Sequence, residues 1–92
     1  MNSLPVIVLG AGGHARVLID ALLLSPVNLL GMTDTKHQNQ PLLGVPYLGS
    51  DEVIRKYSSN EIHLVNGIGS VSQPYLREKI FKKFKNLGYR FI

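Results

Sequence analysis

The sequence contains no cysteine. The chain therefore has no disulfide, no thiolate nucleophile and no cysteine-ligated metal site. It also lacks an apolar run of the roughly 18 residues that a membrane span needs, so we expect no membrane-spanning helix. No basic segment precedes the apolar stretch at residues 4–9, which argues against a signal peptide. We expect a cytoplasmic protein.

Positive charge is in excess but is gathered late in the chain. The net charge is +4. The residues that carry most of the excess are Arg77, Lys79, Lys82, Lys83, Lys85 and Arg90. No aromatic residues are interspersed with them on the polar face, so a stacking platform for bases is lacking. We interpret the segment as a solvated helix face and expect no nucleic-acid partner.

Apolar runs and turn residues divide the 92-residue chain, which suits a single domain, into alternating strands and helices. Strands are expected at residues 4–9, 28–33, 62–66 and 89–92, with a short extended piece at 45–48. Helices are expected at residues 13–24, 50–57 and 74–87. This order predicts an α/β fold, a small Rossmann-like domain with a parallel sheet of about four strands flanked by helices. Glycine turns follow the strands at 4–9 and 62–66, which suggests that these two strands are neighbours.

The two longer helices differ in character. Apart from His14, the only charged residues of the first helix are Arg16 and Asp20. We therefore expect little of this helix to face water. It should pack on the sheet and be partly covered by something else. The last has an apolar stripe with basic residues opposite. The stripe consists of Leu76, Ile80, Phe84 and Leu87.

The segment Gly-Ala-Gly-Gly-His-Ala at residues 10–15 matches the G-x-G-x-x-G/A phosphate-binding pattern. It follows a predicted strand and opens a predicted helix, the context in which the pattern has meaning. Gly10 permits the tight turn, Gly12 lets the backbone approach a phosphate, and Ala15 lets helix and strand pack closely. Together with Gly13 and the helix N-terminus, they predict an anion-binding turn.

Three polar residues lie near this turn. Asp34 ends the second strand, where an acidic residue accepts a hydrogen bond from ribose or contacts a base; as a loop carboxylate it would instead cap the turn. Lys36 either neutralises a phosphate or is solvated. His14, in the first helical turn, either donates to the ligand or faces an attached domain. With His37 in a loop and His63 on a strand, the histidines indicate no metal site, and no residue is assigned as catalytic.

A second glycine turn, Gly67-Ile68-Gly69, follows the strand at 62–66. It would present further backbone donors to the same ligand. Arg77 lies one turn into the next helix, where it either reaches back to a phosphate or belongs to the solvated basic face.

These residues resemble a known family. The segment Gly-Ala-Gly-Gly-His-Ala-Arg-Val at 10–17 is similar to the opening motif of bacterial sugar O- and N-acyltransferases of the NeuD/PglD type. Further matches lie at residues 31–34, 43–50, 67–69 with Arg77, and 88–91. The resemblance covers essentially the whole chain.

The resemblance implies that this domain binds a nucleotide-linked sugar, typically a UDP-sugar. A C-terminal left-handed β-helix of hexapeptide repeats would bind acetyl-CoA, build trimers and carry the histidine that acts as general base. Gly10, Gly12 and Gly13 would lie near the phosphates, Asp34 and Lys36 near uridine, and residues 67–69 along the same cleft.

Two departures from the family pattern limit what is implied. Asp34-Thr35 stands where many relatives have two acids, and no hexapeptide repeat occurs before Ile92. We therefore expect residues 1–92 to be the binding domain alone, without the acetyl-CoA site or the catalytic histidine. The parent acetyltransferase is expected to be a homotrimer. Residues 1–92 by themselves are expected to be monomeric or weakly dimeric. The sugar and the choice between amine and hydroxyl stay open.

Two other functions fit part of the sequence. The glycine pattern and Asp34 alone suit an NAD(P)-binding redox domain equally well, although the chain supplies barely one of that fold's two halves. A nucleotide-sensing module without catalysis would use the apolar first helix as its partner surface.

Overall fold

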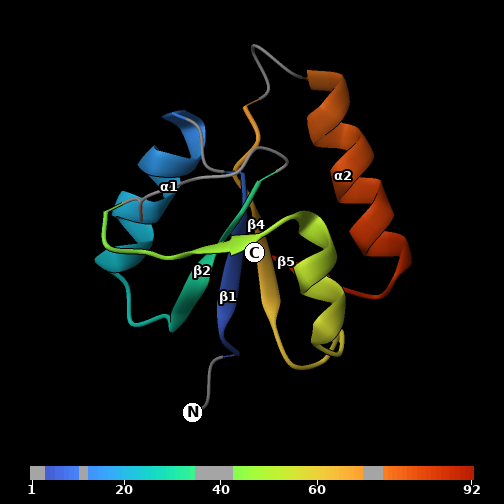
Figure 1. Cartoon of the computed structure of the whole chain (residues 1–92), viewed down its shortest axis with the longest axis horizontal. Helices are drawn as coiled ribbons and strands as arrows, with labels where there is room; N and C mark the ends of the chain where they lie inside the picture. The colour runs from blue at the N-terminus through green and yellow to red at the C-terminus, as the bar shows by residue number, and fades with distance from the viewer. Residues whose placement is uncertain (1–3, 11–12, 35–42, 70–73) are drawn as a thin grey trace.

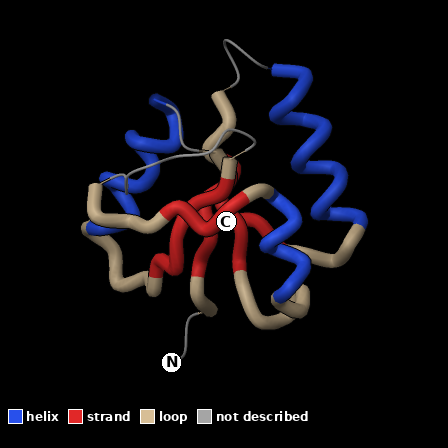
Figure 2. Tube along the Cα trace, in the orientation of Figure 1, coloured by secondary structure: helices blue, strands red, loops and turns tan. Residues whose placement is uncertain are grey.

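A computed structural model of the chain describes residues 4–10, 13–34, 43–69 and 74–92. A parallel five-stranded sheet of order β3-β2-β1-β4-β5 forms the middle layer, with helices on both sides (Figures 1 and 2). The strands are β1 (Val6–Leu9), β2 (Leu29–Thr33), β3 (Tyr47–Gly49), β4 (His63–Asn66) and β5 (Arg90–Phe91). The helices are α1 (Gly13–Leu23), the 3₁₀ helix η1 (Asp51–Lys56) and α2 (Pro74–Asn86). The predicted α/β class is confirmed.

Strand β1 is the centre of the sheet and is buried on both faces. Its side chains alternate, because Ile7 and Leu9 pack into the cluster with η1 and α2, whereas Val6 and Val8 pack against α1. This two-sided burial explains why the segment is a continuous apolar run rather than an alternating one.

The strand pairing confirms that the two strands followed by glycine turns are neighbours. β1 pairs with β4, and Leu9 is in register with Asn66. On its other side β1 pairs with β2, where Leu9 is in register with Thr33. The extended piece expected at 45–48 is the edge strand β3, which is why the sheet has five strands rather than about four.

The expectation that α1 faces water little is wrong within the described structure. Ala15 and Ile19 are buried against the sheet, but Val17 is 66% and Leu24, just beyond the helix, 89% exposed. An apolar composition does not bury a helix all round when the fold supplies a sheet on one side only.

Helix α2 packs its predicted apolar stripe through Ile80, Phe84 and partly Leu76. Leu87 is an exception, because it follows the end of the helix and is 42% exposed. The four lysines of α2 are exposed as predicted, and two form ion pairs. Lys82 pairs with Glu78 at 3.0 Å and Lys83 with Glu52 at 3.1 Å. In the described part of the chain, no helix is long and apolar enough to cross a membrane.

Candidate functional site

The carboxyl ends of the three central strands meet at one edge of the sheet. Since Leu9 is in register with both Thr33 and Asn66, the residues that follow them are brought side by side. These residues are Gly10, Asp34 and Gly67. Ligands of open α/β sheets bind at this edge, and sequence reasoning placed all three there.

The first glycine turn requires glycine at position 10. Gly10 has φ +96°, a backbone conformation that is strained for any residue with a Cβ atom. Its amide donates to the carbonyl of Thr33 at 2.6 Å. The first turn is thereby tied to the end of β2, one residue before Asp34.

The second glycine turn requires glycine at position 67 because of close packing rather than φ. A Cβ on Gly67 would lie 2.6 Å from the carbonyl oxygen of Leu9 and 2.9 Å from the Cβ of Ala15. Ala15 is completely buried. The small residue expected for helix–strand packing therefore also makes room for the second turn.

Asp34 is half-buried at the end of β2. Its amide donates to the carbonyl of Gly49 at 3.0 Å, and its carbonyl accepts from the Tyr47 hydroxyl at 3.3 Å. Next to it, the buried Thr33 hydroxyl donates to Asp51 Oδ1 at 2.9 Å. This tie between β2 and η1 was not anticipated; the only sequence signal was a hydroxyl residue in a buried strand.

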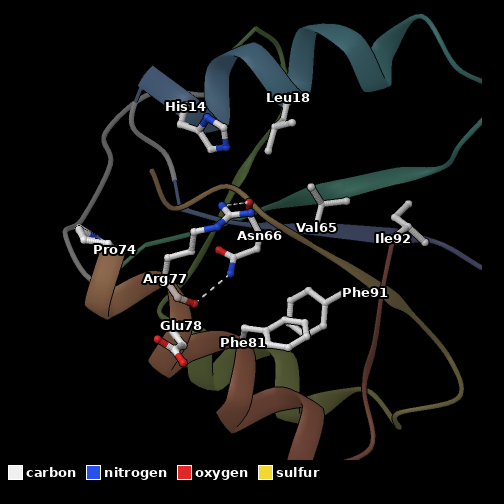
Figure 3. A pocket seen from close by; sticks show the side chains of 10 residues that line it. All are labelled: His14, Leu18, Val65, Asn66, Pro74, Arg77, Glu78, Phe81, Phe91 and Ile92. Atoms are coloured by element: carbon white, nitrogen blue, oxygen red, sulfur yellow. Dashed lines mark hydrogen bonds between the residues drawn. The ribbon is translucent and has the colours of Figure 1, made fainter. Parts of the chain in front are cut away.

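A cavity of about 650 Å³ opens between α1 and α2 beside this edge (Figure 3). His14 and Leu18 line it from α1, Asn66 from β4 and Arg77 from α2. Its apolar lining includes Phe81 and Phe91, whose ring centroids are 4.9 Å apart. Its volume is within the range of small-molecule sites, and it combines an apolar lining with a few polar groups.

Arg77 is part of the cavity wall rather than of the solvated basic face. Its Nη1 donates to the carbonyl of Asn66 at 3.1 Å and to the carbonyl of Ile68 at 2.7 Å. The Asn66 side chain returns a hydrogen bond from Nδ2 to the carbonyl of Arg77 at 3.1 Å. Sequence analysis did not single out Asn66.

A family model described as "PglD N-terminal domain" matches residues 5–84. The chain belongs to this family. The resemblance seen in the sequence is thereby confirmed.

Several solved acetyltransferases resemble this PglD N-terminal domain. PerB from Caulobacter crescentus, in complex with CoA and GDP-perosamine, is 28% identical with a TM-score of 0.73, over 92% of this chain and 39% of that one. A mutant of the perosamine N-acetyltransferase from the same organism, with the same ligands, has the same identity and coverage and a TM-score of 0.77. This chain thus spans about two-fifths of the length of these proteins.

A more distant structure shows the same fold. The acetyltransferase domain of PglB from Neisseria gonorrhoeae, in complex with acetyl coenzyme A, is 21% identical with a TM-score of 0.73, over 96% of this chain and 42% of that one. Among curated proteins, none matches this sequence.

The remaining predicted site residues have different outcomes in this PglD N-terminal domain. Gly13 is the first residue of α1, and the exposed His14 follows it at the cavity. Gly12 and Lys36 lie outside the described residues. His63 lies on β4, and within the described ranges no three His, Asp or Glu side chains gather as a metal site.

The second glycine turn uses part of its donor capacity within the protein. The Gly67 amide donates to the carbonyl of Leu9 at 2.8 Å, and the Ile68 amide donates to Asn66 Oδ1 at 3.2 Å. The turn lies where sequence reasoning placed it, at the same edge as Gly10, but these two amides already have acceptors.

Proposed function

We propose that the chain is the nucleotide-sugar-binding domain of a bacterial sugar acetyltransferase. The observation that carries the proposal is the meeting of Gly10, Asp34 and Gly67 at one edge of the sheet, beside the N-terminus of α1 and an open cavity. This is the arrangement that binds phosphate-containing ligands in α/β folds. Membership of the PglD N-terminal domain family and similarity to acetyltransferases support it.

The proposed pose places the diphosphate on residues 10–13 and the first turn of α1. Backbone amides at a helix N-terminus and its partial positive charge favour an anion there. His14 would donate to the phosphate or the sugar. Asp34 and Lys36 would contact the ribose or base, and Gly67, Ile68 and Gly69 would line the same cleft. The cavity between α1 and α2 would then receive the sugar.

The nucleotide is proposed to be uridine diphosphate. PerB was solved with a GDP-sugar, so a guanine nucleotide is the alternative that the test must include. Asp34 suits either base, because a carboxylate accepts hydrogen bonds from the imide N–H of uracil or from the N–H groups of guanine.

The transfer step is proposed to use parts of the enzyme outside residues 1–92. An amine or hydroxyl of the bound sugar would attack the thioester carbonyl of acetyl-CoA, lose its proton to a base, and release CoA. We propose that a β-helix domain supplies the base and the acetyl-CoA site in a homotrimer. Residues 1–92 would bind and select the acceptor sugar.

Isothermal titration tests the proposal directly. The chain is titrated with UDP-N-acetylglucosamine, UDP, GDP-mannose and NAD, each to about 1 mM, a concentration at which millimolar sites become measurable. Saturable heat with UDP-sugar or GDP-sugar supports the function, and the stronger of the two identifies the base. Heat with NAD alone, or with no compound, contradicts it.

A further inference from the structure

The second glycine turn is held by a reciprocal pair of side chains. Arg77 Nη1 binds the carbonyls of Asn66 and Ile68, while Asn66 Nδ2 binds the carbonyl of Arg77. Asn66 Oδ1 also accepts from the Ile68 amide. We call these four hydrogen bonds the Asn66–Arg77 clasp. Those that involve Arg77 join the end of β4 and the turn after it to the first turn of α2, and Figure 3 shows the bonds between Asn66 and Arg77.

The clasp fixes the direction of the turn's peptide groups. Two carbonyls converge on one guanidinium nitrogen at 3.1 and 2.7 Å, so both are held on the same side of the turn. A charged donor makes these bonds stronger than bonds between neutral groups. Pairing with β1 holds Asn66 and the Gly67 amide, and the clasp adds side-chain bonds that fix the carbonyls of Asn66 and Ile68 and the amide of Ile68.

The position of the second glycine turn restricts the position of the first, because the two backbones are in close contact. A Cβ built on Gly10 would lie 3.3 Å from the carbonyl carbon and oxygen of Gly67, so the two backbones are already close. Gly67 also contacts the region of Leu9 and Ala15 too closely to admit a methyl group. Because close-packed groups transmit displacement, a shift of Gly67 is passed to the phosphate-binding turn.

We propose that Arg77 is a positioning residue: the Asn66–Arg77 clasp sets the position of both glycine turns, and thereby the affinity for the nucleotide sugar. This deepens and rests on the proposed function. It differs from a direct phosphate contact, because Arg77 acts here through the backbone carbonyls that its Nη1 holds. It also explains why one cation of α2 lies in the cavity wall while the four lysines of the helix are exposed.

The test compares Arg77→Ala with Lys79→Ala, which removes the same charge from an exposed position on α2. Arg77→Ala is expected to lower nucleotide-sugar affinity about tenfold or more, and Lys79→Ala less than about twofold. In the ligand-free chain, the amide resonances of Gly10 and Gly67 should move in Arg77→Ala only. Ethylguanidinium should restore both the resonances and the affinity of Arg77→Ala.

Each other outcome overturns the inference. Lost affinity with unmoved Gly10 and Gly67 resonances would make Arg77 a direct ligand contact. Moved resonances with unchanged affinity would make the clasp irrelevant to binding. If Arg77→Ala does not fold, Asn66→Ala and Arg77→Lys replace it and are compared with Lys79→Ala in the same two measurements, nucleotide-sugar affinity and the amide resonances of Gly10 and Gly67. A wild-type chain that binds no nucleotide sugar overturns the proposed function as well, whereas binding unaffected by the variants overturns only the positioning role.

Discussion

The amide of Gly67 donates to the carbonyl of Leu9 at 2.8 Å, and a Cβ at position 67 would lie 2.6 Å from that same oxygen. The end of β1 and the turn after β4 therefore pack so closely that there is no room for a side chain at position 67. Only a glycine makes this hydrogen bond without displacing the backbone. The first glycine turn begins at the next residue, Gly10, so the packing of two strand ends and the candidate binding site depend on the same place.

Substituting Gly67 by alanine should lower the free energy of unfolding by about 1–3 kcal/mol, the usual cost of forcing a methyl group into a packed region. Chemical denaturation measures it. Gly44→Ala is the control, since nothing lies within 4 Å of its added Cβ, although its φ of +82° strains the variant. Nucleotide-sugar affinity should fall in Gly67→Ala and stay in Gly44→Ala. Equal affinity in both variants would contradict the account.

Tyr89→Phe should separate stability from binding. The Tyr89 hydroxyl donates to the carbonyls of Ile54 at 3.1 Å and Tyr57 at 2.6 Å, in the core between η1 and α2. Losing it should lower the free energy of unfolding by about 1–3 kcal/mol. Because Tyr89 precedes β5, at the sheet edge opposite the glycine turns, titration should show unchanged ligand affinity below the melting temperature. A large loss of affinity in the folded variant would count against our placement of the site.

The Thr33–Asp51 hydrogen bond should stabilise the edge of the sheet next to Asp34. Thr33→Val should lower the free energy of unfolding by about 1 kcal/mol, because a fully buried hydroxyl donor is removed at constant shape. Asp51→Asn retains an oxygen acceptor and should cost less than Asp51→Ala. Thermal melts of the three variants check this order, and equal melting temperatures for the two Asp51 variants would show that the contact contributes nothing.

Asp34 should contribute to ligand affinity. Asp34→Asn keeps the backbone bonds to Gly49 and Tyr47 but removes the charge. We expect nucleotide-sugar affinity, measured by titration, to fall about tenfold, the typical contribution of a hydrogen bond to a charged group. Glu52→Gln on η1 is the matched control. A neutral result at Asp34 would assign the nucleoside to another part of the edge.

Much of the fold could be predicted because its signals are local. The apolar run before Gly10 and the run before Gly67 identify two buried strands, and their glycine turns indicate that they are neighbours. By contrast, β3 has three residues and lies in a turn-rich segment. Its pairing depends on the close approach of Leu48 to Gly31, where a Cβ would lie 2.6 Å from the leucine Cγ.

The sequence suggested the glycines, Asp34 and Arg77 as candidate site residues, but for Arg77 it left a phosphate contact and the solvated basic face as alternatives and did not indicate the partners of its side chain. The partners of Arg77 are backbone carbonyls, which every residue has, so no residue type marks them in the sequence. Helical spacing placed Arg77 among basic neighbours, and only the packing of α2 beside β4 separates it from them. The same limit applies to Val17 in α1 and to Leu24 just after it, which are exposed although in the sequence they look like core residues.

The most direct test of the central claim is to map ligand contacts by amide chemical shifts, titrating the ¹⁵N-labelled chain with UDP-N-acetylglucosamine and with GDP-mannose. The account predicts saturable shifts at Gly10, Gly13, Asp34 and Gly67, with none beyond background on the outer face of α2 at Lys82 and Lys83. Shifts confined to α2 and η1, or no saturable shift with either nucleotide sugar, would contradict it.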